Sequence, residues 1–374
     1  MLRIERITLL EVHLTLKEPF QISSGTQTHK RVLLAHLLSS DGAEGWGECA
    51  AGSVPNYSYE TVDTAWLALR EWVAPRVLGR TFNGPEEIQP ALDVGFHEHR
   101  MAKAAVEMAG WDLAARAEGV SLAKKLGGSR DRIPVGISIG IQASPDVLVT
   151  KARAALERGY RKVKIKIKPG SDFEFLSAAR QALGPDAPLM ADANNAYTLA
   201  DVESLKRLDD LNLMMIEQPL AHDDLLRHVE LQKQLRTPIC LDESITSVDR
   251  AEDMIALGSG RIINIKPGRV GGFRQSLAIH DLCARHGIPV WCGGMLEAGV
   301  GRAHNVALAS LPNFTLPGDL SPSEHYWQKD IVIPEWTMDR EGWIQVPVDR
   351  PGIGVEIDRE RIEAEAVRRE ELTA

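Results

Sequence analysis

The sequence predicts an α/β protein built on a (β/α)8-type barrel, with a smaller α+β domain before it. Short apolar strand-like segments recur at intervals of about 25 residues, and helical stretches with start signals separate them. An open doubly wound sheet is the alternative, but its phosphate-binding G-x-G-x-x-G turn is missing after the first strand. The predicted strands are Ile133–Ile139, Val163–Ile167, Pro188–Ala191, Leu213–Ile216, Pro238–Leu241, Ile262–Ile265, Pro289–Cys292 and Asn313–Leu316.

The two ends of the chain have a different pattern. Residues 1–130 predict an α+β capping domain, because strand-like segments come first and a helical stretch follows. Residues 131–320 hold the barrel. Residues 321–374 are too short to fold alone, so we expect them to pack back on the capping domain and complete it. The segments of the two ends are the strands Ile4–Leu16, Val32–Leu38 and Gly45–Cys49, the helical stretch Tyr59–Arg116, and a hairpin-like pair, Trp343–Val346 and Pro351–Val355.

The composition indicates an ordinary globular protein. With 44% hydrophobic and 25% charged residues, the chain is not of the disordered, collagen-like or coiled-coil classes. A net charge of −9 disfavours a nucleic-acid partner, because an acidic surface repels phosphates. The four cysteines are scattered, which predicts reduced thiols in a cytoplasmic protein. We expect no signal peptide and no membrane span.

Acidic residues end three consecutive predicted strands. Asp192, Glu217 and Asp242 lie 25 residues apart, which predicts equivalent positions at the barrel's C-terminal end, where active sites of this fold lie. One such acid alone could be a helix N-cap or a surface residue, but three in register indicate one site. Buried together they need a cation to stay ionised. Oxygen ligands favour Mg²⁺, for which Mn²⁺ or another divalent ion can substitute.

Lysines alternate along the second predicted strand and end the sixth. Lys164 and Lys166 share a face with two further lysines, and the apolar face should meet the helices, so we expect the lysines to point into the barrel. Neighbouring ammonium groups disfavour each other's charge, so one of them should be neutral enough near pH 7 to act as a base. Lys266 ends the strand diametrically opposite.

Lysines on both sides of a metal-bound carboxylate predict abstraction of the proton α to that carboxylate. The metal and the lysines would stabilise the enediolate that forms. Return of the proton by the opposite lysine would invert the carbon centre. Departure of a β-leaving group would instead give elimination.

These residues make the chain similar to the enolase superfamily, in its muconate-lactonising subgroup, over essentially its whole length. Within that subgroup it resembles the N-acylamino acid racemases and o-succinylbenzoate synthases, through Gly293-Gly-Met295-Leu-Glu297 and Gly299-Val-Gly301-Arg-Ala303. The superfamily motifs, in the family's order, are Gly45-Trp-Gly-Glu48, Lys164-Ile-Lys166, Asp192-Ala-Asn194, Glu217-Gln-Pro, Asp242-Glu-Ser, Lys266-Pro-Gly and Pro351-Gly-Ile-Gly-Val-Glu356.

The resemblance implies a role for each motif residue. It makes Lys166 and Lys266 the catalytic pair, with Asp192, Glu217 and Asp242 as Mg²⁺ ligands and Lys164 near the substrate carboxylate; lysine or histidine bases with Mg²⁺ are a known property of the superfamily. Specificity would come from two loops, Phe20–Thr26 and Ala50–Tyr59. Dipeptide epimerases carry Asp-x-Asp on the last strand where this chain has Asp319-Leu-Ser321, which favours an acylated over a free amine.

Further residues are predicted to bind substrate beside Lys164. Asn194 follows Asp192 by two residues, and turn formation is an equal explanation for it. Ser138 lies near the C-terminal end of the first predicted strand, where it could contact an acyl group; core packing is at least an equal explanation for it. The complete predicted set is Lys164, Asn194, Ser138, Phe20, Gly294 and Met295.

We therefore expect an enzyme that racemises N-acylated, specifically N-succinyl, amino acids with two lysines. Dehydration to o-succinylbenzoate, a reaction of menaquinone biosynthesis, is expected in the same site. The alternatives are a muconate cycloisomerase-like enzyme and a non-catalytic barrel that binds a metal and an acid. The expected partners are a small-molecule carboxylate and further copies of the chain in a homo-oligomer, with no nucleic acid and no membrane.

Overall fold

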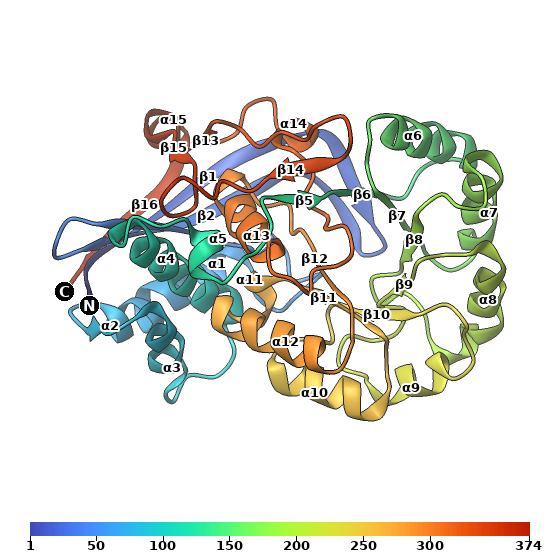
Figure 1. Cartoon of the computed structure of the whole chain (residues 1–374), viewed down its shortest axis with the longest axis horizontal. Helices are drawn as coiled ribbons and strands as arrows, with labels where there is room; N and C mark the ends of the chain where they lie inside the picture. Colours follow the sequence, from blue (N-terminus) through green and yellow to red (C-terminus); the bar gives the residue numbers. More distant parts are fainter.

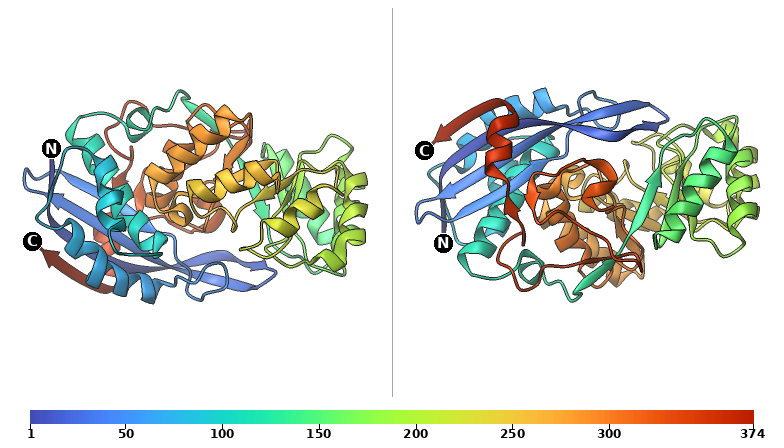
Figure 2. Two further views of the ribbon diagram at one scale, coloured as in Figure 1. Left: turned by 90° about the horizontal axis from the view of Figure 1, so that it is seen from below. Right: turned by 90° about the horizontal axis from the view of Figure 1, so that it is seen from above.

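A computed structural model describes residues 1–374, in which an N-terminal cap of sheet and helices lies against a barrel-like domain (Figure 1). The cap sheet is an antiparallel meander of β1 (Leu2–Ile22), β2 (Gly25–Ser39) and β3 (Glu44–Cys49). Strand β16 (Ala366–Thr373) pairs antiparallel with the other edge of β1, and the short β4 (Thr81–Phe82) pairs with its start. The last strand of the chain therefore lies beside the first, and both termini meet at one end of the molecule (Figure 2).

The hairpin of β1 and β2 is long enough to reach the barrel. Figure 2 shows it extending from the cap along the side of the barrel. At its tip the Ile141 N–H donates to the Gln21 carbonyl at 2.9 Å, and the Ser23 hydroxyl donates to the Asn194 carbonyl at 3.2 Å. The hairpin tip is thereby held over the C-terminal ends of the barrel strands.

Helix α4 (Arg100–Ala117) packs directly on β3 because two glycines in that strand leave room for its backbone. A Cβ on Gly47 would lie 1.9 Å from the Ala105 carbonyl oxygen, and one on Gly45 would lie 2.1 Å from that of Ala109. No larger residue fits at either position without moving the helix. The other cap helices are α1 (Val62–Ala68), α2 (Ala74–Val77), α3 (Ile88–Asp93) and α5 (Leu122–Lys125).

The barrel-like domain contains one parallel sheet whose strands follow each other in chain order. Its strands are buried on both faces: helices cover the outside, and a separate apolar cluster fills the inside. That cluster is Met190, Met215, Cys240, Ile262 and Trp291. The strands are β6 (Gly136–Ile139), β7 (Lys162–Lys166), β8 (Leu189–Asp192), β9 (Ile216–Glu217), β10 (Ile239–Leu241), β11 (Ile262–Ile265) and β12 (Val290–Cys292). The outer helices are α6 (Pro145–Glu157), α7 (Asp172–Leu183), α8 (Val202–Arg207), α9 (Leu226–Gln232), α10 (Val248–Leu257), α12 (Phe273–Arg285) and α13 (Gly299–Ala309).

The predicted last strand, Asn313–Leu316, is wrong, because no regular strand forms there. Pro317 has no N–H to donate to a ladder. The segment that follows still bridges the two ends of the sheet: the Asp319 N–H donates to Cys292 O at 3.0 Å, and the Gly136 N–H donates to Gly318 O at 2.6 Å. An irregular segment thus lies where the periodicity predicts a strand.

Two other strand predictions need correction. The predicted first strand is split: β5 (Arg132–Pro134) pairs antiparallel with β14 (Trp343–Gln345), and only β6 joins the parallel sheet. The hairpin-like tail pair is also wrong. Its second half does not pair with β14; the Gly352 N–H donates to Val120 O instead, at 2.9 Å.

Buried carboxylates of the cap bind the N-termini of barrel helices. Glu48 of β3 accepts the N–H groups of Ala298 and Gly301, at 2.9 and 2.8 Å, where α13 begins. Glu107 of α4 accepts those of Phe273 and Arg274, at 2.7 and 3.0 Å, where α12 begins. Since the first N–H groups of a helix have no partner within it, these acids join the cap to the barrel.

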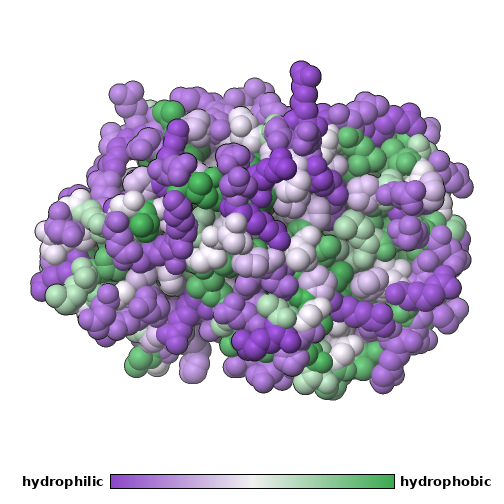
Figure 3. Space-filling view, in the orientation of Figure 1, coloured by the Kyte–Doolittle hydropathy of each residue, from purple (hydrophilic) through white to green (hydrophobic).

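The surface is mixed in polarity. On the face in Figure 3, hydrophilic side chains surround small separate apolar patches. No helix has both the length and the apolar character that crossing a bilayer requires.

Replacing Glu107 with Ala should destabilise the protein. The buried N–H groups of Phe273 and Arg274 would lose their acceptor, so we expect the free energy of unfolding to fall by about 2–4 kcal/mol. Urea or thermal unfolding measures this. As a control, Glu252→Ala, at an exposed residue of α10, should change it by no more than about 0.5 kcal/mol. Equal losses in the two variants would contradict the capping role.

Candidate active site

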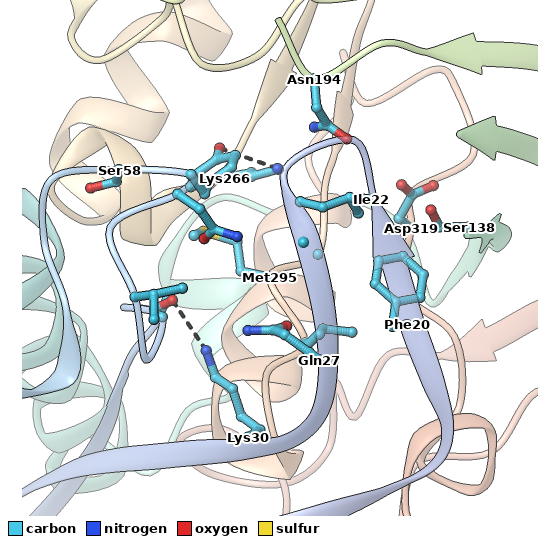
Figure 4. A pocket seen from close by; sticks show the side chains of 18 of the residues that line it. Phe20, Ile22, Gln27, Lys30, Ser58, Ser138, Asn194, Lys266, Met295 and Asp319 are labelled. Atoms are coloured by element: carbon cyan, nitrogen blue, oxygen red, sulfur yellow. Dashed lines mark hydrogen bonds between the residues drawn. The ribbon is translucent and has the colours of Figure 1, made fainter. Parts of the chain in front are cut away.

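A cavity opens where the C-terminal ends of the barrel strands face the cap (Figure 4). Phe20 and Ile22 come from the hairpin and Tyr57 from the segment after β3, whereas Ser138 and Asp319 come from the barrel. The three lysines of the sequence prediction, Lys164, Lys166 and Lys266, line the same cavity. The site is therefore shared between cap and barrel.

Lys164, on β7, lies at the centre of the acidic cluster. Its Nζ is 3.1 Å from Asp192 Oδ2, 3.1 Å from Glu217 Oε2 and 2.5 Å from Asp319 Oδ2. The second carboxylate oxygen of Glu217, Oε1, accepts a hydrogen bond from the Asn264 amide at 2.7 Å. One buried ammonium group is thus shared by three buried carboxylates.

Lys166 lies two residues further along β7, nearer the C-terminal end of the strand, and contacts Asp192 and Asn194. Its Nζ is 2.6 Å from Asp192 Oδ2 and donates to Asn194 Oδ1, also at 2.6 Å. Asn194 has a φ of 42° and Asn195 a φ of 65°, so this turn is left-handed. The Asn194 amide also donates to Glu243 Oε1 at 3.1 Å. Asn194 therefore both forms a turn and reaches the site, so the two sequence-based explanations hold together.

Lys266, at the end of β11, is held by a different carboxylate. Its Nζ is 2.7 Å from Asp242 Oδ2 and 3.2 Å from the Tyr57 hydroxyl. Tyr57 donates to Asp242 Oδ1 at 2.9 Å, and the Arg269 guanidinium also pairs with Asp242. In the sheet, β8, β9 and β10 lie between the strands of Lys166 and Lys266, so the two amines flank the three acids.

The sequence reasoning missed Tyr57 and Arg269 as individual site residues. Arg269 belongs to the short helix α11 (Pro267–Val270), which starts directly after Lys266. Pro267, at the first position of this helix, was the sequence signal that could have identified Arg269. A helical turn that starts there brings Arg269 back towards the site. Tyr57 lies within the predicted specificity loop, but loop sequence alone does not show which side chain enters.

The predicted equivalence of the three acids holds for two of them. Asp192 pairs in register with Glu217, but Glu217 pairs with Cys240, and Asp242 lies two residues beyond that position. Neighbouring barrel strands are staggered along the barrel axis, so equal sequence spacing does not give equal height. Asp242 consequently lies one layer nearer the cap.

The lysines of the site differ in the direction in which their pKa is shifted. Burial alone would lower the pKa of Lys164, but Asp319, Glu217 and Asp192 raise it well above the usual range. The pKa of Lys266 is also raised, because Asp242 outweighs burial. Burial lowers the pKa of Lys162, on the same face of β7, although Asp319 lies beside it. That one lysine of the catalytic pair is neutral enough near pH 7 to act as a base stays a prediction.

The acids fit a hard divalent cation by their chemistry. Asp192, Glu217 and Asp242 are each at most 1% exposed and offer only oxygen donors. No three His, Cys, Asp or Glu side chains have the spacing of a metal site; the Lys164 ammonium lies instead between two of the acids. The place between Asp192 and Glu217 is therefore one that a cation stabilises.

All six residues predicted to bind substrate line the one cavity. The Ser138 hydroxyl is buried there without a hydrogen-bond partner. Phe20, Met295 and Ser138 lie around the space that Figure 4 shows. Lys30 of β2 and Gln27 also line the cavity and were not predicted. The predicted substrate-binding set is Phe20, Ser138, Lys164, Asn194, Gly294 and Met295.

Known proteins resemble this chain over most of its length. The family model of the mandelate racemase / muconate lactonizing enzyme N-terminal domain matches residues 4–127, and that of the enolase C-terminal domain-like family matches residues 147–361. The o-succinylbenzoate synthase of Geobacillus kaustophilus is 51% identical over 97% of this chain and 96% of its own. The N-succinylamino acid racemase of Thermus thermophilus is 50% identical over 95% of both chains.

A solved structure of an enolase superfamily member has the same fold as this chain. An enolase superfamily member from Listeria innocua superposes with a TM-score of 0.96 at 42% identity, over 100% of both chains. The resemblance predicted from the motifs is confirmed, as is the superfamily fold with an N-terminal cap and a barrel-like C-terminal domain. The chain therefore belongs to the enolase superfamily, as an enzyme of the mandelate racemase / muconate lactonizing enzyme type.

Proposed function

We propose that this enzyme removes the proton α to the carboxylate of an N-succinylamino acid and returns it to either face, with Lys166 and Lys266 as the two bases. The observation that carries this is the placement of both amines in one cavity, on strands that flank three buried acids. A protein that only binds an acid has no need of an amine on each side. This disfavours the non-catalytic alternative.

The proton transfers balance between the two lysines. A neutral amine on one face takes the α-proton as the carbon–hydrogen bond breaks, and an enediolate forms. The ammonium group on the other face then donates its own proton to the same carbon, so the configuration inverts. Lys164, which is shared by Asp192, Glu217 and Asp319, keeps positive charge where the substrate carboxylate becomes more negative.

Asp192, Glu217 and Asp242 are the residues that would hold Mg²⁺. Enzymes of this superfamily are generally Mg²⁺-dependent. When bound, the ion supplies electrostatic stabilisation of the enediolate oxygens. The chain's own contribution is to keep the three acids buried at the C-terminal ends of three adjacent strands.

The same proton abstraction can serve a dehydration. If a hydroxyl leaves from the β-carbon once the α-proton is removed, the product is the alkene or aromatic acid and water. We propose o-succinylbenzoate synthesis as a second activity on this basis. Of the two relatives of about 50% identity described above, one is named o-succinylbenzoate synthase and the other N-succinylamino acid racemase. Neither of these two relatives is named for muconate cycloisomerisation.

We also propose a division of labour along the chain. Residues 131–320 supply the acids and lysines, whereas residues 1–130, with 321–374 packed on them, cover the substrate. Phe20, Ile22 and Tyr57 support this, since all three reach the cavity from the cap. Assembly into a homo-oligomer stays a prediction, which light scattering on the purified protein would test.

Each lysine should serve one enantiomer. In D₂O with Mg²⁺, Lys166→Ala should lose α-proton exchange from one enantiomer of an N-succinylamino acid by at least about 100-fold more than from the other, and Lys266→Ala should show the reverse. Proton NMR of the α-position measures both rates. Equal losses for the two enantiomers would leave the lysines a purely electrostatic role.

The dehydration should use the same lysines. We expect wild-type enzyme to convert the dehydration substrate to o-succinylbenzoate, and a change in absorbance measures the rate. The N-succinylamino acid should inhibit this dehydration competitively. Activity that persists in a Lys166→Ala, Lys266→Ala double variant would show that the two reactions use different residues.

Removal of divalent ions should abolish exchange. EDTA treatment followed by dialysis should reduce the rate to background, and Mg²⁺ or Mn²⁺ should restore it. Glu217→Gln should weaken metal binding, raising the Mg²⁺ concentration for half activity by at least about tenfold. Full activity in metal-free buffer would contradict the role of the three acids.

A further inference from the structure

One lysine of the cavity has no acidic partner. Lys164, Lys166 and Lys266 each have a carboxylate oxygen within 4.0 Å, but Lys30 has none. Lys30 lies on β2 of the cap and is only 3% exposed. A buried charge without a counter-ion is costly, and such groups are usually paired.

The contacts of Lys30 leave part of its ammonium group free. Its Nζ donates to the carbonyl oxygens of Ala50, at 3.3 Å, and Ala51, at 3.0 Å. Both acceptors are neutral, and an ammonium group has three N–H donors. No further hydrogen bond of the Nζ is formed within the chain, so one donor remains for a ligand.

The nearest acids do not take that donor. Glu48 and Glu297 influence Lys30 only from a distance, and burial lowers its pKa despite them. Glu48 is bound to the N–H groups at the start of α13, and Glu297 accepts the Met295 N–H at 2.7 Å and the Asn305 amide at 2.9 Å. Their oxygens are directed at these donors.

Lys30 also lies away from the reacting end of the cavity. In Figure 4, Lys30 and Gln27 are below the space, whereas Asn194 and Lys266 are above it. A substrate whose α-carbon is held between Lys166 and Lys266 would therefore extend its other end towards Lys30.

We propose that Lys30 binds a second carboxylate of the substrate, remote from the reacting carbon, and thereby selects succinyl over neutral acyl groups. This inference rests on the proposed function and deepens it. The succinyl carboxylate is the group that N-succinylamino acids and o-succinylbenzoate have in common. One cation at the far end of the cavity would then serve both proposed reactions, since the succinyl group is unchanged in each.

The competing explanation is that Lys30 only holds the Ala50–Ala51 backbone in place. The two roles differ in what they discriminate. A loop-holding lysine affects every substrate alike, whereas a carboxylate-binding lysine affects only those with the second negative charge. Substrates that differ in that one group separate the two roles.

The test compares three acyl groups on one amino acid: succinyl, its neutral amide analogue succinamoyl, and acetyl. We expect wild-type enzyme to prefer succinyl over succinamoyl by about 10- to 100-fold in kcat/KM for α-proton exchange. Lys30→Met should abolish this preference by raising KM for the succinyl substrate, with kcat changed by less than about threefold and the acetyl substrate unaffected. Lys124→Met, which removes an exposed lysine outside the cavity, is the matched control and should change none of these values.

Each other outcome overturns the inference in a distinguishable way. An equal loss for all three substrates in Lys30→Met would show loop support only. If that variant does not fold, as judged by circular dichroism, the wild-type comparison decides alone, and equal kcat/KM for succinyl and succinamoyl substrates would overturn the inference. Absence of exchange with every substrate in wild-type enzyme would instead overturn the proposed function, and this inference with it.

Discussion

The need to compensate buried carboxylates governs the whole active site. Asp192, Glu217 and Asp242 lie at the end of a parallel sheet whose strands are buried on both faces, so solvent does not stabilise their charge. Each is therefore held by cationic or amide groups. The lysines that do this are the same groups that flank the cavity, so the electrostatic demand of the fold and the placement of the proposed bases have one origin.

A second set of buried acids is stabilised by a different means. Glu48 and Glu107 receive backbone N–H groups at helix N-termini, and burial raises the pKa of each to about 7. Backbone donors are fixed in the fold and cannot be displaced by a ligand. A lysine side chain can leave its carboxylate when a substrate or a metal ion arrives. The interface acids are thus structural, and the site acids are free to change partners.

The strand period was enough to predict a barrel-like domain, and the motifs were enough to predict the superfamily. The residues that end the strands all lie around the candidate site. The predictions of the last strand and of the equal height of the three acids failed because both depend on how neighbouring strands pair. Pro317 interrupts the last strand, and the stagger of neighbouring strands moves Asp242 out of register. Neither follows from spacing along the chain.

The missed side chains have a similar explanation. Tyr57 and Lys30 enter the cavity from the cap, so their role depends on how two parts of the chain dock. A sequence motif marks chemistry that one set of strands performs. It does not mark a contact that arises only when a second sheet closes over those strands.

The proposed separation of chemistry and selection would explain why relatives of about equal identity are named for two reactions. In this proposal both reactions begin with loss of the α-proton, which residues of the barrel-like domain carry out. The reactions would then differ in the group that leaves or returns at the carbon, which depends on the substrate that the cap admits. In this acidic protein, a cavity whose lysines are mostly compensated by their own carboxylates has little charge left to attract an anion. Lys30 is the exception, because its positive charge has no acid beside it. Lys30 is therefore the lysine of this cavity at which we propose that a remote substrate carboxylate binds.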